Sequence, residues 1–258
     1  GRVEMENCRR SAKLGLLLSS GSRPRYRDDI VRVLALPTRG HHQFRYRDTH
    51  VPPAFFDQLL KDRLRDQEAL IAYLDASTKD AEPEIVPCRY ARILNSEVEG
   101  DFAVIRFEVR GFAKLDAPTT FRKELKAIAR SDELPLPYWQ DGNLKGYFFH
   151  VLSRWPVGCV SDEDRRSWQM LVARLGSRTD FQDCPFFYNV RGLFEEGQAQ
   201  RLTPLQGRYV LKPHRLYRVD VTHYACETAV VAAGEDAGEG RIVVGIRGEG
   251  VRPLTDEG

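Results

Sequence analysis

The feature that most constrains the fold is a pattern of two neighbouring β-strands over residues 85–112. In residues 105–110 (IRFEVR) apolar and charged side chains alternate, which is typical of a strand with one buried and one wet face. Residues 95–101 hold Asn, Ser, Gly and three acidic residues, and we expect them to form the turn. Pro87 lacks a backbone donor and predicts a sheet edge or a bulge near the start of the first strand. This hairpin indicates a mainly β (β-rich α+β) protein.

More strands are expected before this hairpin. Residues 30–36 (IVRVLAL) and 41–47 (HHQFRYR) flank the turn sequence PTRG and predict a second hairpin. Residues 69–74 (ALIAYL) predict a buried strand, and a helix is expected over residues 51–64. Together these elements would form a small barrel or a curved sheet with one helix over residues 28–115.

The second half of the chain predicts a separate domain. Residues 116–137 combine a helical pattern with the stiff sequence LPLP, and we place a linker there. Residues 138–258 then contain strand patterns over residues 181–194, 207–211 and 216–224 (LYRVDVTHY). A helix is expected after Ser161, and its apolar face holds Trp168, Leu171, Val172 and Leu175. This half therefore predicts an immunoglobulin-like β-sandwich with an inserted helix.

The start of the chain is basic. Residues 1–50 carry eleven Lys or Arg and five Asp or Glu, although the formal net charge of the chain is only +2. We expect residues 1–27 to be a basic, flexible arm. Residues 41–47 place aromatic and arginine side chains on opposite faces, which fits either a surface for nucleic acid or a core face with a charged outer face. The second arrangement is the more ordinary one. The candidate binding residues are Arg23, Arg25, Arg27, Phe44, Arg45, Tyr46 and Arg47.

Five cysteines without a CxxC pair favour a reducing compartment, and no apolar run is long enough for a membrane-spanning helix. We therefore expect a soluble, cytoplasmic protein without a membrane partner. His41 and His42 would point to opposite faces of a strand, so they do not form a shared metal site. His223, Cys226 and Cys184 lack an evident fourth ligand. The sequence thus predicts neither a metal site nor a cofactor.

No catalytic signature is present: the chain has no GxGxxG, Walker, HExxH or GxSxG sequence. We therefore predict a non-enzymatic protein-binding or regulatory module, with another protein as its partner. A prokaryotic regulatory or defence complex is one setting for such a module. The first alternative is a nucleic-acid-binding protein that uses the basic and aromatic N-terminal surface. The second is a Cys-dependent hydrolase that pairs Cys88 or Cys184 with a histidine, although Cys88 is expected to be a buried strand residue.

Overall fold

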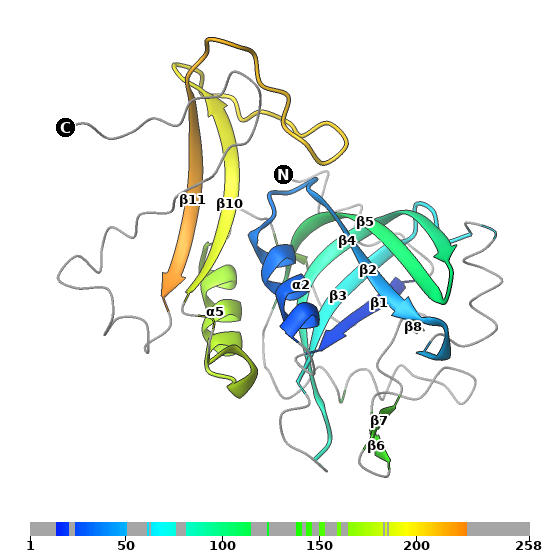
Figure 1. The fold of residues 1–258 in the computed structure, drawn as a ribbon. Helices are drawn as coiled ribbons and strands as arrows, with labels where there is room; N and C mark the ends of the chain where they lie inside the picture. The colour runs from blue at the N-terminus through cyan, green and yellow to red at the C-terminus, as the bar shows by residue number, and fades with distance from the viewer. Residues whose placement is uncertain are drawn as a thin grey trace.

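The computed structural model describes residues 14–20, 24–50, 61, 63–75, 81–114, 123, 138–140, 143–145, 150–152, 159–160, 165–182, 184 and 186–225. Their main feature is a seven-stranded sheet (Figure 1). Its strands are β1 (Leu14–Ser20), β2 (His41–Arg47), β3 (Glu68–Asp75), β4 (Glu84–Glu99), β5 (Phe102–Ala113), β8 (His150–Leu152) and β9 (Cys159–Val160). The strand order is β2-β5-β4-β3-β1-β8, and β9 pairs with the end of β5.

The other elements surround this sheet. They are the helices α2 (Pro24–Ala35) and α5 (Arg165–Gly176), the 3-10 turns η1 (Asp48–His50) and η2 (Thr179–Phe181), the small hairpin β6 (Tyr138–Gln140) and β7 (Asn143–Lys145), and the ribbon β10 (Phe186–Glu195) and β11 (Tyr217–Ala225). The mainly β class is confirmed. A closed barrel and an immunoglobulin-like sandwich are not, because the described sheet is open and the ribbon has two strands.

The expected hairpin over residues 85–112 is confirmed as β4 and β5, which pair antiparallel. The expected turn over residues 95–101 is wrong, because strand pairing continues to Glu99 and leaves only Gly100 and Asp101 as the turn. Glu97 and Arg106 form an ion pair across the two strands. The acidic stretch is therefore part of a cross-strand charge ladder and not a loop.

The strand expected over residues 69–74 is also confirmed, as β3. The register between β3 and β4 shifts so that Ile71 faces Arg89 while Ala72 faces Pro87. Cys88 is thus the extra residue of a bulge. This agrees with the prediction of an edge or a bulge at Pro87, which cannot donate to a regular ladder.

The N-terminal expectations are wrong in two places. Leu14–Ser20 is an internal strand of the sheet between β3 and β8, so this part of the expected flexible arm is ordered. A strand with neighbours on both edges and cover on both faces has a continuous apolar sequence, and LGLLLSS fits that description. Residues 30–36 are not a strand, because helix α2 continues to Ala35; its start at Pro24 suits proline in a first helical turn.

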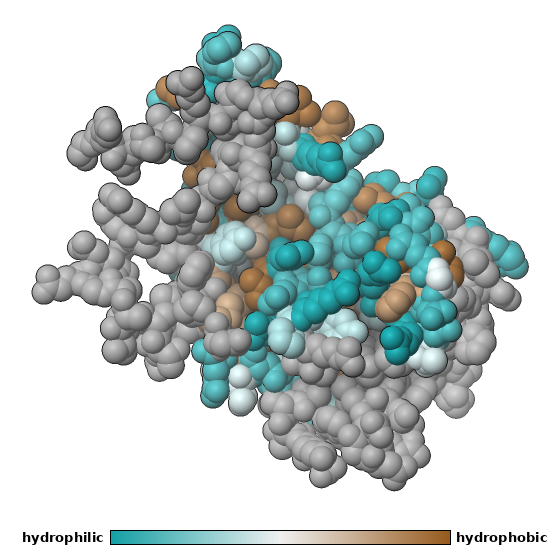
Figure 2. All heavy atoms as spheres, viewed as in Figure 1, coloured by the Kyte–Doolittle hydropathy of each residue, from teal (hydrophilic) through white to brown (hydrophobic). Residues whose placement is uncertain are grey.

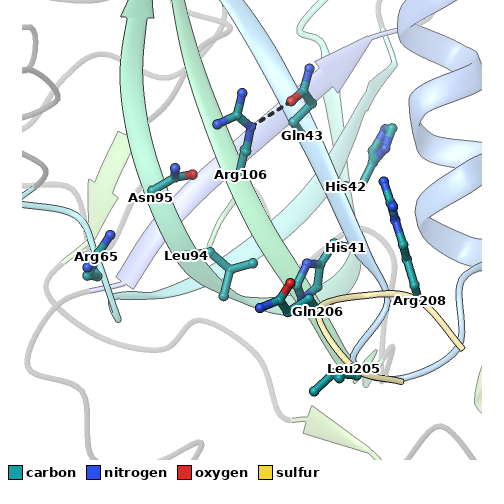
Figure 3. Close-up of a pocket in the computed structure, with 10 residues that line it drawn as sticks. All are labelled: His41, His42, Gln43, Arg65, Leu94, Asn95, Arg106, Leu205, Gln206 and Arg208. Carbon is teal, nitrogen blue, oxygen red and sulfur yellow. Dashed lines mark hydrogen bonds between the residues drawn. The ribbon is translucent and has the colours of Figure 1, made fainter. Parts of the chain in front are cut away.

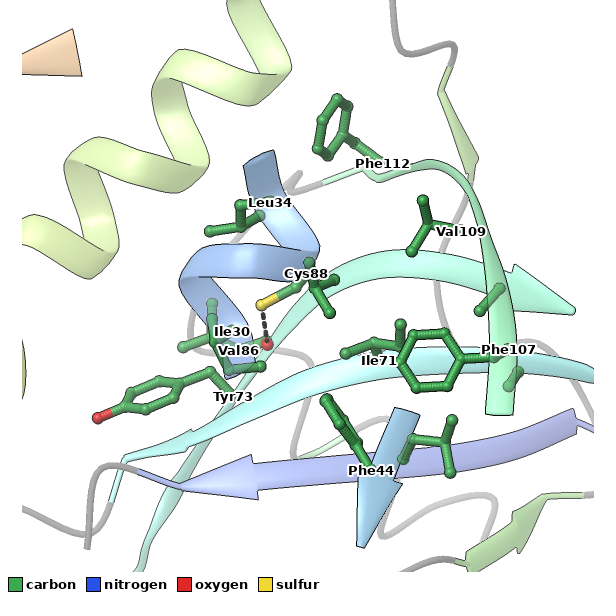
Figure 4. Close-up of a cluster of buried hydrophobic side chains, with 14 of the residues drawn as sticks. Ile30, Leu34, Phe44, Ile71, Tyr73, Val86, Cys88, Phe107, Val109 and Phe112 are labelled. Carbon is green, nitrogen blue, oxygen red and sulfur yellow. Dashed lines mark hydrogen bonds between the residues drawn. The ribbon is translucent and has the colours of Figure 1, made fainter. Parts of the chain in front are cut away.

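Helix α2 packs across one face of the sheet and closes the core (Figure 4). Ile30, Val33 and Leu34 have helical spacing and are wholly buried. They contribute to one cluster with Phe44 of β2 and Phe107 of β5. Burial of each such side chain stabilises the fold by about 1.5–3 kcal/mol, so this face holds α2 firmly beside β2.

The helix expected after Ser161 is confirmed as α5, and all four residues of its predicted apolar face are buried. Its C-terminal end is joined to the sheet by ion pairs: Arg174 contacts Glu84, and Arg178 contacts Asp75 as well as Glu84, the latter with an Nη2–Oε2 distance of 2.6 Å. Strands over residues 186–195 and 217–225 confirm two of the predicted strands. The strand expected over residues 207–211 is wrong, since these residues take part in only one isolated bridge, between Leu205 and Arg208.

Two short strands from the second half complete the main sheet. β8 pairs with β1, and β9 pairs with β5. The division into two domains stays a prediction. The expected helices over residues 51–64 and within residues 116–137 fall mostly outside the described residues.

A buried arginine joins α2 to the sheet. Arg89 in β4 is wholly buried, and its Nη1 donates to the carbonyl oxygens of Val33, at 2.7 Å, and Leu36 at the end of α2. Its Nε donates to the carbonyl oxygen of Arg110 at 2.8 Å, and its guanidinium lies 4.5 Å from the ring centroid of Phe112. Helix C-terminal carbonyls carry partial negative charge, which offsets the buried cation.

We expect Arg89→Met to lower the free energy of unfolding by about 3 kcal/mol, because the methionine fills the space but leaves buried carbonyls without donors. Arg92→Met is the matched control on the same strand, since Arg92 pairs with Asp66 at 2.7 Å on an exposed surface. That loss should cost less than about 1 kcal/mol. Urea unfolding of the three chains measures both values, and equal midpoints for Arg89→Met and the native chain would contradict the assignment.

Candidate functional site at the open edge of strand β2

Strand β2 forms one edge of the main sheet and pairs only with β5 among the described residues. The register of the pair fixes where its backbone groups point. Backbone bonds from Asp48 N to Asp101 O and from Val109 N to Gly40 O place even-numbered residues in the ladder with β5. The N–H and C=O groups of residues 41, 43, 45 and 47 therefore point away from the sheet.

Two open hollows adjoin this edge, and both are lined by His42 and Gln43. The loop-side hollow, of about 780 Å³, lies between the outer face of the sheet and the loop that joins β10 to β11 (Figure 3). The helix-side hollow, of about 500 Å³, lies between α2 and β2. The loop-side hollow is lined by His41, His42, Gln43, Arg65, Leu94, Asn95, Arg106, Leu205, Gln206 and Arg208. The helix-side hollow is lined by Arg25, Tyr26, Asp28, Asp29, Arg32, His42, Gln43 and Arg45.

The two histidines lie on opposite faces of β2, as the strand pattern predicted. His42 Nε2 lies 2.9 Å from Asp29 Oδ1 of α2, and its ring packs edge-on against Phe44. His41 Nε2 lies 3.7 Å from Glu108 Oε2. The two side chains thus belong to different hydrogen-bonding groups, one toward the helix and one toward the sheet surface.

The loop between β10 and β11 passes very close to the side chain of His41, at the start of β2. Gly207 has a φ of +75°, and a Cβ at this position would lie 2.5 Å from Cγ of His41. Only glycine combines this backbone conformation with so close an approach. The Arg208 side chain extends from here along the open edge toward His42 (Figure 3).

The structure separates the predicted binding residues. Phe44 and Tyr46 are buried in the core, where the Tyr46 hydroxyl donates to the carbonyl oxygen of Leu18 at 3.0 Å. Burial is the largest cause that raises the pKa of Tyr46 well above its usual value. Neither ring is presented for base stacking. The arrangement is the ordinary one, with an aromatic core face and a charged outer face.

The predicted arginines have different surroundings. Arg45 and Arg47 both lie over the ring of Phe102, at 4.9 Å and 5.8 Å from its centroid. Arg27 is partly buried and contacts Asp28 at 3.4 Å. Arg25 is exposed on α2, and Arg23 lies outside the described residues. Of this set, Arg25 and Arg45 come together in the helix-side hollow.

Sequence reasoning missed the residues that the fold adds to this edge. Asp29 and Arg32 lie at or next to residues 30–36, which were predicted to be a strand, and Arg208 lies in residues 207–211, which were predicted to be a strand of another domain. The local signal was Gly207, which precedes Arg208 and follows the turn-forming residue Pro204 by three positions.

The cysteine and metal hypotheses are tested in part. Cys88 is wholly buried; its Sγ donates to the carbonyl oxygen of Val86 at 3.2 Å, and burial raises the pKa of its thiol to about 12. A thiol that stays protonated is a poor nucleophile. Cys184 is partly buried against the core. Within the part of the chain that the structure describes, no three His, Cys, Asp or Glu side chains are grouped to hold a metal ion.

No family model, curated protein or solved structure matches this chain. Among the described helices, none has the length and apolar character needed to cross a membrane.

We expect Gly207→Ala to destabilise the chain by more than about 1 kcal/mol, because alanine is strained at positive φ and its Cβ collides with His41. In a His41→Gly background the collision disappears and only the strain remains. Thermal unfolding of the two single variants and the double variant gives a coupling energy, expected to be about 1 kcal/mol. Additive effects would show that the loop does not pack on β2.

We expect Cys88 to resist alkylation in the folded chain. At pH 8 iodoacetamide should modify it at least about a hundredfold more slowly than in the urea-unfolded chain, because few thiolates form and the sulfur is covered. Peptide mass spectrometry follows each cysteine separately, with partly buried Cys184 as the internal comparison. Equal rates for Cys88 in both states would contradict its burial.

Proposed function

We propose that this chain is a protein-binding module that receives an extended segment of a partner protein as an additional strand on β2. The observation that carries the proposal is the outer edge of β2, a seven-residue strand whose odd-numbered backbone groups face away from the sheet and which no described strand covers. An extended peptide gains main-chain hydrogen bonds at such an edge, and side-chain hollows beside it supply selectivity.

The surroundings of the edge support this reading. An added strand places alternate side chains on the two faces of the sheet. One set would face the helix-side hollow, and the other would face the loop-side hollow, since both hollows share His42 and Gln43. Each face of the sheet therefore has a hollow beside β2 that could hold side chains of the added strand.

The loop between β10 and β11 offers apolar contact close by. Of the four exposed large hydrophobic side chains among the described residues, Leu205, Val210 and Leu216 lie in this loop, with exposed fractions of 65%, 70% and 58%. Figure 2 shows hydrophobic atoms at the surface of the ribbon and its loop, whereas the surface near α2 and β2 is mainly hydrophilic. Leu205 also lines the loop-side hollow. Exposed apolar groups beside polar ones are typical of protein-binding surfaces.

The nucleic-acid alternative is weaker, because both candidate stacking rings are inside the core. The cysteine hydrolase is weaker for Cys88, whose thiol is buried and protonated at neutral pH. Neither alternative makes use of the open edge.

The test substitutes the backbone donor at the centre of the edge. Gln43→Pro removes the outward N–H but spares the ladder with β5, because proline is tolerated where an edge strand faces solvent. Gln43→Ala is the matched control, since both variants lose the bond from Arg106 Nε to Gln43 Oε1 at 3.1 Å.

Partners are first identified by co-purification from source-cell lysate after nuclease treatment, and the affinity of the purified partner is then measured by calorimetry. Gln43→Pro should weaken binding at least about tenfold, and Gln43→Ala should change it less than about twofold. Circular dichroism confirms that both variants are folded. Undiminished binding by folded Gln43→Pro would refute strand addition, and loss of every partner on nuclease treatment would favour nucleic acid.

A further inference from the structure

We infer that the segment received at the β2 edge is acidic; this inference rests on the proposed strand addition and specifies the chemistry of its partner. The lining residues of the two hollows include six arginines and two aspartates. Both aspartates already have cationic or imidazole neighbours: Asp28 contacts Arg27 at 3.4 Å, and Asp29 contacts His42 at 2.9 Å. The positive charge around the edge is therefore in excess.

The excess is concentrated in three side chains. Arg25 and Arg32 on α2 and Arg208 on the loop are exposed, and none has an ion pair with a described residue. Arg208 lines the loop-side hollow, while the two arginines of α2 line the helix-side hollow. Each side of the edge therefore has an arginine without an ion-pair partner among the described residues.

The neighbouring arginines on the sheet are already neutralised. Arg106 forms ion pairs with Glu97 and Glu99, and Arg45 contacts Glu99 at 3.5 Å. These cross-strand pairs stabilise the outer face and leave little charge for a partner. The attraction for a ligand must therefore come from α2 and the loop, which flank the edge rather than belong to it.

A second copy of this chain is a poor occupant. If two β2 strands paired antiparallel about Tyr46, Arg45 of each would face Arg47 of the other. Like charges placed directly across a strand pair are destabilising. The charge that fits this edge is negative. Because successive side chains of a strand enter opposite hollows, acidic residues at adjacent positions reach cations on both sides.

The experiment uses the full chain and three capped peptides of about eight residues in which pairs of Val alternate with pairs of Glu, of Gln or of Lys, so that each face of the added strand carries the tested side chain. Backbone amide NMR shifts report binding and its location. The Glu peptide should bind at least about tenfold more tightly than the Gln peptide, shift the amides of residues 41–47, and weaken between about 50 mM and 500 mM salt. The Lys peptide should not bind.

Different outcomes separate the two proposals. Equal binding of the Glu and Gln peptides at the amides of β2 would refute the acidic preference and leave strand addition in place. Binding of the Glu peptide without shifts in β2 would refute strand addition. Failure of the Glu peptide to bind would overturn the acidic inference, and tighter binding of a short oligothymidylate would assign the surface to nucleic acid instead.

Charge reversal supplies the residue-level test. Arg32→Glu and Arg208→Glu should each weaken the Glu peptide about five- to tenfold, and the double variant should gain affinity for the Lys peptide. That gain cannot come from misfolding. Arg166→Glu on the exposed side of α5 is the control and should leave both affinities unchanged. Unaltered Glu-peptide affinity in the double variant would overturn the inference.

Discussion

The contact between Arg89 and the end of helix α2 is the interaction on which the arrangement of the described chain depends. A wholly buried guanidinium must find acceptors, and backbone carbonyls at the end of α2 and in β5 supply three of them. The helix dipole and the ring of Phe112 offset its charge. Because the accepting carbonyls lie at the C-terminal end of α2, this contact fixes the position of α2 over the sheet along the helix axis. The position of α2 sets its distance from β2, and this distance is the width of the helix-side hollow.

The same helix end also holds the ribbon. The side-chain nitrogen of Asn189 in β10 donates to the carbonyl oxygen of Leu34 at 2.8 Å, so β10 and β4 share the last carbonyls of α2. Ion pairs from Arg178 of the neighbouring α5 segment to Asp75 and Glu84 add a second attachment to the sheet. These two attachments lie near the start of β10. The loop at the opposite end of the ribbon lies near β2 (Figure 1). The loop-side hollow is thus a consequence of contacts made at the other end of the ribbon.

Sequence patterns predicted the elements whose periodicity is determined by one buried face. Strand β5 and helix α5 belong to this group, because each has an apolar stripe that matches its period. Strand β3 is buried on both faces and was predicted from its apolar run and the loop that follows it. The predictions failed where short apolar runs carry no period: residues 14–20 resembled a tail, and residues 30–36 are rich in β-branched side chains that favour strands. In that second run the contact of α2 with the sheet overrides local propensity, because the helix buries Ile30, Val33 and Leu34 together. Acidic residues at 97 and 99 resembled a loop because their arginine partners lie on other strands.

The candidate site could not be predicted for a related reason. Its strand was recognised, but its edge position, its register and the cations around it come from pairings distant in sequence. A charged edge strand ordinarily protects a sheet against nonspecific pairing. In this chain the arginines of the outer sheet face are largely paired, whereas Arg32 and Arg208 stand beside the edge without described partners. In the proposed binding mode, arginines of β2 itself oppose self-pairing, whereas the arginines that flank the strand attract an acidic segment. Substitution of Arg32 and Arg208 would therefore reduce the preference of the edge for acidic over neutral segments, and not only its affinity for the acidic one.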